Sequence, residues 1–516
     1  MTSLAAVGGR LRAEADRVED WPAWQSAALM VVLIALSLWF RTRVLGAAYW
    51  IDEGISVGIA HHPFTSIPHL LRQDGAPPLY YLLLHIWIGW FGDSERATHT
   101  LSLIFALACI PLGYWVARSL FGALAGWVCA GLAAVDPYLT YYAQETRMYT
   151  MVACLSFVAA GAYVQGVLNG RRRYLLVLAV SLDLILYTHN WGLFLCVGFG
   201  VATLVFARDR LREAAIAGGV TVLLYAPWLP TLLNQSKHTG APWAMVPSFH
   251  ALLLAPGAVL SGDGPFMAFV LAAGAGLAAV IRMRSDSVRR TVLALAVAVG
   301  VTVLMAWLVS LFSPAWATRY FAVVVGPLLV IAAAGLVRAG RIGLVALVAI
   351  GVLWSNYVLK DDKENAREIA HGLVKYAHPG DLVISTQPEQ VPVLRYYLGP
   401  GLRFGTTLGP VPDPQIMDWR DALSRLKQAT PSADLEPLLA TVKPGQDLIV
   451  VSPVFRDYRA WEARWTKLVY LTSQTWTKAI ASDPRFHQVA VIQTDEILLK
   501  RNFFKPLQAV VYVRSR

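Results

Sequence analysis

Long apolar runs, separated by short polar or charged turns, dominate the first 360 residues of the chain. A helix needs about 20 apolar residues to cross a bilayer, and runs of about this length recur with turns or charges at their ends. The pattern predicts a polytopic α-helical membrane protein with about eleven transmembrane helices. They fall near residues 24–45, 97–117, 123–140, 149–168, 174–189, 191–206, 214–232, 265–281, 291–312, 320–337 and 342–358.

One apolar segment, residues 77–91, departs from this pattern because it is short and rich in aromatic residues. A helix that lies in the membrane interface fits such a segment better than a span does. We therefore predict a juxtamembrane helix here, inside a long loop over residues 46–96.

The pattern changes after residue 360, where charged residues become frequent and short apolar strands alternate with helical patterns. Strands are predicted at residues 381–385, 447–452, 488–500 and 509–514. About 150 residues can bury a core of their own. We expect a transmembrane domain over residues 1–360 and a separate extracytoplasmic α/β domain over residues 361–516.

Composition agrees with a membrane protein: 56% of the 516 residues are hydrophobic and only 15% are charged. The net charge of +11 comes from arginine clusters between apolar runs, which is the positive-inside distribution and gives no reason to expect a nucleic-acid partner. If the N-terminus is cytoplasmic, these clusters all lie inside: Arg118, Arg171–Arg173, Arg208–Arg212, Arg282–Arg290 and Arg338–Arg341. Arg41 and Arg43, at the outer end of the first span, are the exception.

The same alternation places the loop over residues 46–96 and the C-terminal region outside the membrane. High use of Ala, and of Arg over Lys, indicates a GC-rich bacterium. The predicted location is the bacterial inner (plasma) membrane, with the functional groups on the periplasmic face.

Two adjacent carboxylates, Asp52 and Glu53, follow the first span directly. Acidic residues so close to hydrocarbon are costly to keep, so a functional role is the default hypothesis. A hydroxyl that attacks an electrophile must lose its proton, and a carboxylate within hydrogen-bond reach can accept it.

Several short motifs, taken in order along residues 24–360, resemble the GT-C superfamily of membrane glycosyltransferases. Within it, the resemblance is to the branch of the protein O-mannosyltransferases and the lipid A aminoarabinose transferase. The motifs are Asp52-Glu53 after the first span, Pro77-Pro78-Leu79-Tyr80-Tyr81, Phe91-Gly92-Asp93-Ser94 with Arg96, and the run Tyr141–Tyr149.

The resemblance implies an inverting glycosyltransferase that moves a sugar from a polyprenyl-phosphate donor to a hydroxyl acceptor on the outer face. The acceptor would be a cell-envelope glycan, a glycolipid or a protein, and lipid-linked mannose or arabinose would be natural donors. The motif match assigns the general base to Asp52, with Glu53 as a second candidate base or a helper that orients the loop.

The departing polyprenyl phosphate carries negative charge that cations must stabilise. Arg147 and Arg319 lie at outer span boundaries and can each bind two phosphate oxygens. The predicted substrate-binding residues are Asp74, Tyr81, Glu145, His189 and Asn190.

Each assignment has a structural alternative. Arg319 could simply reach the lipid headgroups, and Glu145 with Arg147 could form a local ion pair that ends a helix. His189 and Asn190 could cap a tight turn, and turn formation explains Asp74 almost as well.

No cofactor is required by the sequence. A divalent cation stays an alternative, since Asp52, Glu53 and Glu145 could supply the several oxygens that a hard cation needs. No HExxH or DxD spacing occurs near the loops, so we predict no metal site.

Two other functions compete with the enzyme. A lipid or sugar-lipid transporter (flippase) would fit the spans, but transporters often show internal repeats and mid-membrane polar residues. The chain has no convincing repeat, and its polar residues gather at one face. A membrane-anchored binding module would leave Asp52, Glu53 and Arg147 unexplained.

Overall fold

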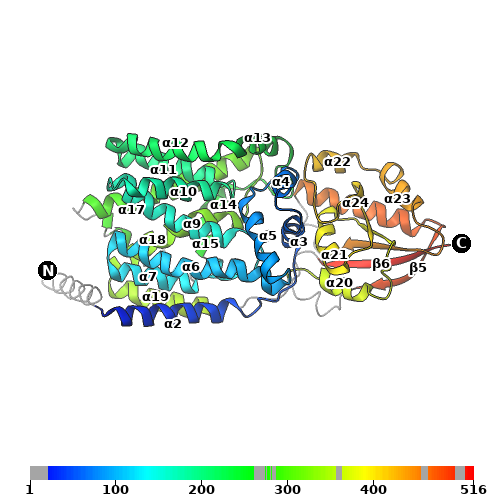
Figure 1. Cartoon of the computed structure of the whole chain (residues 1–516), viewed down its shortest axis with the longest axis horizontal. Coiled ribbons are helices and arrows are strands. Elements are labelled where there is room, and N and C mark those ends of the chain that lie inside the picture. The colour runs from blue at the N-terminus through cyan, green and yellow to red at the C-terminus, as the bar shows by residue number, and fades with distance from the viewer. Residues whose placement is uncertain are drawn as a thin grey trace.

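The computed structural model describes residues 21–260, 286–355, 363–454, 463–493 and 506–515, with a few residues between 274 and 281. The molecule is elongated. A helical bundle occupies one end and an α/β domain the other, and short helices lie between them (Figure 1).

The bundle consists of long apolar helices that run side by side (Figure 1). They are α2 (Ala23–Arg41), α6 (Glu95–Phe121), α7 (Ala123–Val135), α9 (Tyr149–Tyr163), α10 (Arg173–Leu186), α11 (Gly192–Phe206), α12 (Leu211–Tyr225), α17 (Asp286–Phe312), α18 (Ala322–Arg338) and α19 (Arg341–Ser355). Small residues such as Ala and Gly fill many of the contacts, as expected where helices approach closely in lipid.

Within the described residues, six helical segments are long and apolar enough to cross a membrane. This supports a multi-pass membrane protein, although the full set of eleven spans is not reproduced at that length. The fifth and sixth predicted spans are the short helices α10 and α11, and the seventh is α12 followed by α13 (Leu229–His238). The predicted span at 265–281 and the boundary at residue 360 lie mostly outside the described residues.

Arginine-bearing turns meet at the end of the bundle that is far from the α/β domain. Arg290 Nε donates to the carbonyl of Phe206 at 2.6 Å, and both Arg210 and Arg290 contact the Asp209 carboxylate. Helix α10 begins beside them at Arg173 and ends at Leu186, close to His189 at the opposite end. The arginine clusters and the candidate site residues therefore lie at opposite ends, as the charge pattern predicts.

Arg41, an exception in the charge pattern, is not a loop residue. It is fully buried and donates to the carbonyls of Ala106 (2.8 Å) and Ala133 (2.6 Å). The Ala133 carbonyl would normally accept from the N–H four residues on, but Pro137 has none. Arg41 takes the place of that missing donor, so its charge carries no information about the side of the membrane.

Short helices of the first outer loop cap the bundle at its other end. They are α3 (Ile51–Ala60), α4 (Ile67–Asp74) and α5 (Leu79–Phe91), and they lie between the bundle and the C-terminal domain (Figure 1). The helix predicted at residues 77–91 is thus present as α5, whose 13 residues are fewer than a span requires.

The C-terminal domain is built on a six-stranded mixed sheet of order β3-β2-β1-β4-β6-β5. The strands are β1 (Leu382–Ser385), β2 (Arg403–Thr406), β3 (Gly409–Val411), β4 (Asp447–Pro453), β5 (Phe486–Ile492) and β6 (Leu507–Arg514). Only β1 pairs in parallel, with β2 and with β4. All the predicted strands are found, although the second half of the one at 488–500 lies outside the described residues.

Helices cover both faces of this sheet, which explains why its central strands are continuous apolar runs. On β1, Ile384 faces α23 (Glu436–Ala440) and α24 (Arg464–Ala481), whereas Val383 faces α20 (Ala366–Leu373) and α21 (Val391–Leu398). Alternate side chains thus build two separate cores.

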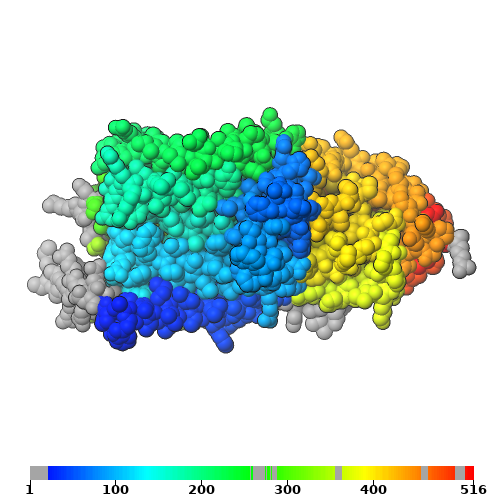
Figure 2. Space-filling view, in the orientation of Figure 1, coloured from blue at the N-terminus to red at the C-terminus, as the bar shows by residue number. Residues whose placement is uncertain are grey.

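The α/β domain packs directly on the outer loop, and Figure 2 shows no gap between the two surfaces. Helix α3 approaches α21 so closely that a Cβ on Gly54 would lie 2.6 Å from the Cβ of Val393. A Cβ on Gly58 would overlap the backbone carbonyl of Gln415. These glycines, one turn apart, allow the two domains to dock along α3.

Replacing Gly58 with Ala should therefore loosen this interface. Overpacking of a tight contact typically costs about 1–3 kcal/mol, so we expect a lower unfolding temperature in detergent and faster proteolysis of the C-terminal domain. Gly89→Ala, on α5 where a Cβ would meet nothing within 4 Å, is the matched control. Equal stability of the two variants would contradict the role of Gly58.

Candidate active site

Helix α3 carries the adjacent carboxylates and begins immediately after Trp50. The Glu53 side chain accepts the backbone N–H of Trp50 at 3.4 Å, which closes the first turn of the helix. Asp52 lies in that same turn, and its side chain keeps 19% of its surface exposed. The next residue, Glu53, points away and is fully buried.

Asp52 lines a cavity of about 410 Å³ at the end of the bundle that meets the C-terminal domain. Most of the predicted site residues meet there, namely Asp52, Asp74, Arg147, His189, Asn190 and Arg319. They come from α3, α4, the loop before α9, the turn between α10 and α11, and the turn before α18. The cavity is therefore assembled from segments that lie far apart in the sequence.

Both predicted phosphate-binding arginines flank the Asp52 carboxylate. Arg319 Nη2 lies 3.4 Å from Oδ2 of Asp52, and Arg147 Nη2 lies 3.9 Å from the same oxygen. Arg147 is held in place by Nη1, which donates to Ser56 Oγ at 2.8 Å and to the Tyr81 hydroxyl at 3.3 Å. Neither arginine extends away to headgroups, and Arg147 pairs with Asp52 rather than with Glu145.

Aromatic rings surround the second arginine. The Arg319 guanidinium lies 4.4 Å from the ring centre of Trp243 and 5.4 Å from that of Trp50, within cation–π range. The Nε atoms of Arg147 and Arg319 are both buried and have no hydrogen-bond partner among the described residues. A buried donor without a partner is costly, so these two groups are polar sites that the described residues leave unsatisfied.

Asp74 is the second carboxylate that lines the cavity. The Tyr81 hydroxyl donates to its Oδ2 at 3.3 Å, so Tyr81 links Asp74 to Arg147 without lining the cavity itself. Burial raises the pKa of Asp74 to about 6, against the opposing effect of Arg147. Asp74 also has a hydrogen bond with the backbone of Ala76, so the turn-forming role and the position at the cavity are both present.

The turn that follows α10 contributes His189 and Asn190. His189 Nδ1 accepts the backbone N–H of Trp191 at 3.1 Å, so this nitrogen is unprotonated. Asn190 Nδ2 donates to the carbonyl of Gly75 at 3.2 Å, while its Oδ1 is buried without a partner among the described residues. The turn-capping role and the cavity-lining position are thus both present.

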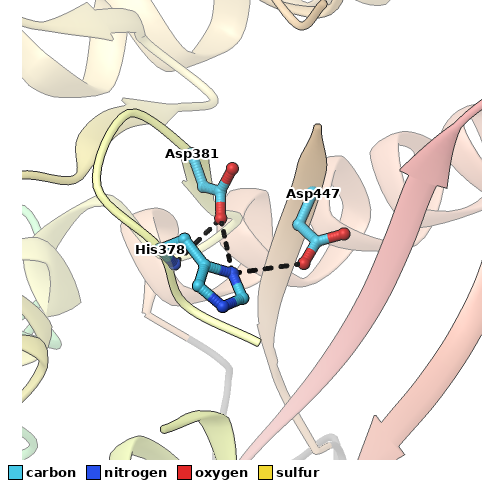
Figure 3. A group of neighbouring side chains, drawn as sticks. All are labelled: His378, Asp381 and Asp447. Carbon is cyan, nitrogen blue, oxygen red and sulfur yellow. Dashed lines mark hydrogen bonds and ion pairs between the residues drawn. The ribbon is translucent and has the colours of Figure 1, made fainter. Parts of the chain in front are cut away.

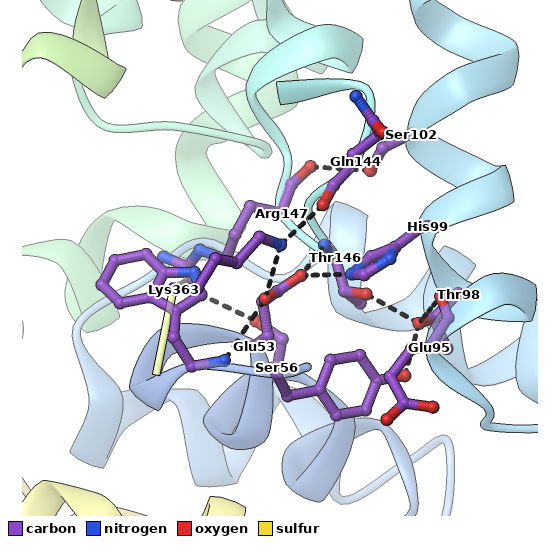
Figure 4. Close-up of polar contacts among 12 residues, drawn as sticks. Glu53, Ser56, Glu95, Thr98, His99, Ser102, Gln144, Thr146, Arg147 and Lys363 are labelled. Carbon is purple, nitrogen blue, oxygen red and sulfur yellow. Dashed lines mark hydrogen bonds and ion pairs between the residues drawn. The ribbon is translucent and has the colours of Figure 1, made fainter. Parts of the chain in front are cut away.

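Glu53 and Glu145 do not line the cavity. The Glu53 carboxylate accepts from His99 Nε2 (2.6 Å), Lys363 Nζ (2.9 Å) and the Thr146 backbone N–H (2.7 Å), as Figure 4 shows. Burial alone would raise the pKa of this carboxyl, but Lys363 and His99 hold it well below its usual range. Contrary to its place among the predicted catalytic residues, Glu53 has no route to a substrate in the cavity. It fits the alternative of a helper that orients the loop.

Glu145 is also buried, and its Oε2 has no hydrogen-bond partner among the described residues. Burial raises the pKa of this carboxyl to about 7, which Lys363 opposes and Glu53 reinforces. The predicted contact of Glu145 with substrate is therefore not supported by its position.

Of the three carboxylates considered for a divalent cation, only Asp52 lines the cavity. Among the described residues, one group has a metal-ligand composition: His378, Asp381 and Asp447 in the C-terminal domain (Figure 3). His378 Nδ1 lies 3.6 Å from Asp381 Oδ2 and 3.8 Å from Asp447 Oδ2. These residues sit where β1 and β4 begin and contribute nothing to the cavity.

Comparison with known proteins bears on the fold. No family model matches the chain, and no curated protein matches it by sequence. Among solved structures, it is similar to ArnT from Cupriavidus metallidurans in the apo state, with a TM-score of 0.61, 14% identity, and coverage of 94% of this chain and 98% of that one.

Arabinofuranosyltransferase AftD from Mycobacteria also matches, with a TM-score of 0.54, 16% identity, and coverage of 97% of this chain and 40% of that one. The oligosaccharyltransferase AglB from Archaeoglobus fulgidus, in complex with an inhibitory peptide and a dolichol-phosphate, has a TM-score of 0.51 at 12% identity. That match covers 84% of this chain and 69% of AglB. These neighbours are GT-C glycosyltransferases. The chain has the GT-C fold.

Within this GT-C fold, several cavity residues were not predicted from the sequence. Trp243 and Tyr320 lie in or beside turns at span boundaries, and Trp419 comes from the C-terminal domain. The Trp419 backbone N–H donates to the carbonyl of Gln73 at 2.9 Å, which fixes this wall against α4. An aromatic residue at a predicted interface was the available signal for Trp243 and Tyr320, whereas nothing in the sequence marks Trp419.

The raised pKa of Glu145 predicts a pH dependence of stability. The ordinary value is 4.5 and the folded value is about 7, so the folded state binds the extra proton between these limits and the free energy of unfolding falls as pH rises through them. Glu145→Gln should remove this loss of stability. The free energy of unfolding should rise by up to ~3 kcal/mol above pH ~7 and change little below pH ~4.5. Thermal unfolding in detergent at acidic and alkaline pH measures it, and the same shift at both pH values would contradict it.

Proposed function

We propose that the chain is an inverting glycosyltransferase that moves a sugar from a polyprenyl-phosphate donor to a hydroxyl acceptor on the outer face of the membrane. The observation that carries the proposal is the Asp52 carboxylate, which lines the cavity between the arginines 147 and 319. The site thus contains a carboxylate that can accept a proton and two arginines that can stabilise a departing phosphate.

Asp52 acts as the general base in this proposal. The acceptor O–H gives its proton to the Asp52 carboxylate while the acceptor oxygen forms a bond to the anomeric carbon from the side opposite the phosphate. The bond between that carbon and the phosphate oxygen breaks, its electron pair leaves with the phosphate, and the configuration inverts. Asp74, also in the cavity, is placed to contact sugar hydroxyls.

Arg147 and Arg319 stabilise the polyprenyl phosphate as its charge grows. Each has a buried Nε without a partner among the described residues, and each side chain is less than a fifth exposed. Fixed donors in a poorly solvated site are worth more than donors in water, because they need no reorganisation during the reaction. AglB, a neighbour in fold, binds a dolichol-phosphate in its solved complex, which agrees with a lipid-phosphate ligand.

An apolar groove supports a lipid-linked donor. It has a volume of about 460 Å³ and is lined by α10, α11 and α12, with Leu182, Phe199 and Val222 among its residues. Leu232 lines both this groove and the polar cavity, so the two spaces lie on either side of one residue. A polyprenyl tail could occupy the groove while its phosphate reaches the arginines.

The flippase alternative is less well supported. A transporter places its polar binding groups near the bilayer midplane, whereas here the polar cavity lies at one end of the bundle, against the C-terminal domain.

Replacing Asp52 with Asn should abolish most sugar transfer. Loss of a general base typically lowers the rate by about 10²–10⁴-fold. The measurement is transfer of label from polyprenyl-phosphate sugars in membranes, at matched expression. Asp93→Asn is the control because Asp93 pairs with His61 in the same outer loop, outside the cavity. Transfer by Asp52→Asn at the wild-type rate would exclude Asp52 as the base.

Arg319→Ala should instead weaken use of the donor. Charge-assisted hydrogen bonds contribute about 1.5–3 kcal/mol, so we expect a roughly 10–100-fold loss in kcat/KM for the donor. The control is Arg72→Ala, an exposed arginine of the same outer loop that does not line the cavity. Unchanged donor affinity and turnover in Arg319→Ala would remove this arginine from the proposed site.

A further inference from the structure

The buried carboxylate beside the proposed base is bound from three directions. Its Oε1 accepts the backbone N–H of Thr146 (2.7 Å), the residue before Arg147, and His99 Nε2 (2.6 Å). Its Oε2 accepts from Lys363 Nζ (2.9 Å). Glu53 thus joins α3, which carries Asp52, to the loop that carries Arg147 and to the start of the C-terminal domain.

Lys363 reaches deep into this site from outside the bundle. Its side chain is only 9% exposed, and Nζ also donates to the carbonyl of Gln144 at 2.6 Å. Both of its partners lie close in sequence to residues that line the cavity, because Glu53 follows Asp52 directly and Gln144 lies three residues before Arg147. A lysine that only held the domains together would not need these partners.

The hydrogen-bond partners in this cluster define the role of Lys363. His99 Nδ1 faces the backbone carbonyl of Leu45 at 2.7 Å, which can only accept, so Nδ1 donates to it, while Nε2 lies 2.6 Å from Oε1 of Glu53. Thr146 N–H also requires an acceptor at Glu53. Thr146, His99 and Lys363 thus all contact the same buried carboxylate, and Lys363 brings a positive charge to it from the C-terminal domain.

We infer that Lys363 is a positioning residue: through Glu53, the C-terminal domain holds Asp52 and Arg147 at the distances that sugar transfer requires. The inference deepens the proposed function and rests on it for its catalytic consequence, while its structural consequence can be measured independently. The C-terminal domain is then part of the active enzyme and not only a cover for the cavity.

Lys363→Met removes the charge at similar length. Misplacing reacting groups by about 1 Å can cost about 100-fold, so we expect kcat to fall ~10–100-fold with a smaller change in donor KM. Arg367→Met is the matched control, because Arg367 makes an interdomain ion pair with Glu95 at 3.2 Å that does not touch Glu53. Equal kcat in the two variants would overturn the inference, and Lys363→Arg, which keeps the charge, should retain most of the activity.

A pH profile separates positioning from general loss of stability. Without Lys363, burial pushes the pKa of Glu53 upward, so raising the pH should restore the charge and part of the rate in Lys363→Met. His99, Glu145, Tyr49 and Tyr80 also face or influence this carboxyl. The recovery must therefore disappear in the Glu53→Gln/Lys363→Met double variant. When Glu53 is already replaced with Gln, Lys363→Met should lower kcat little further. If the losses in kcat of the two single variants multiply in the double variant, the inference is overturned.

Hydrogen exchange provides a readout that needs no activity. Lys363→Met should speed amide exchange in peptides spanning 51–60 and 144–148, relative to Arg367→Met, because Nζ no longer holds Glu53, which accepts the Thr146 N–H, or the Gln144 carbonyl. If Lys363→Met shows faster exchange but the wild-type protein transfers no sugar, the positioning role is supported and only the proposed function is contradicted. Unchanged exchange together with an active wild type would contradict the positioning role alone.

Discussion

The fully buried carboxylate of Glu53 is the interaction on which the outer end of this molecule depends. Taking a charge out of water is expensive unless the charge is paired and fully hydrogen-bonded. Glu53 meets that condition only when the helix α3, the loop before Arg147 and Lys363 of the C-terminal domain are all in place. The cost of burying one charge therefore enforces the relative positions of segments that are hundreds of residues apart.

The cavity concentrates charge and aromatic surface in a small volume. Asp52 and Asp74 supply negative charge, Arg147 and Arg319 supply positive charge, and Trp243 covers the second arginine. The Nε atoms of both arginines are buried and have no partner among the described residues. The apolar groove, which Leu232 also lines, is the space that the proposal gives to a hydrocarbon tail. Charge, aromatic rings and groove are the features on which the proposed use of a lipid-linked sugar rests.

Much of this arrangement could be predicted from the sequence, for identifiable reasons. Spans follow from the length and apolarity of runs, and the alternation of Arg clusters places the candidate residues at one end of the bundle. Asp52, Arg147 and Arg319 could be selected because charged residues beside apolar spans are costly. The roles of Asp52 and Glu53 could not be distinguished from the sequence. Adjacent residues of a helix point to different surroundings, and only the tertiary contacts of Glu53 with His99 and Lys363 show which of the two is buried.

The remaining features depend on contacts that leave no local pattern. From the sequence, Arg41 is interpreted as a charged residue at the end of a span, and only its hydrogen bond to the Ala133 carbonyl shows that it is buried in the bundle. Lys363 lies just past the predicted domain boundary, where a lysine is ordinarily a solvated surface residue. Trp419 belongs to a segment without helical or strand periodicity, and it reaches the cavity only because its backbone binds Gln73.

Trp419 also sets an order of events during synthesis. The bundle side of the cavity is encoded before residue 360, but the wall that Trp419 provides does not exist until the last fifth of the chain is being made. Before that stage, the charged cavity lacks the wall that Trp419 supplies. The cavity would be completed in one late step, when the C-terminal domain folds onto helices that have already assembled.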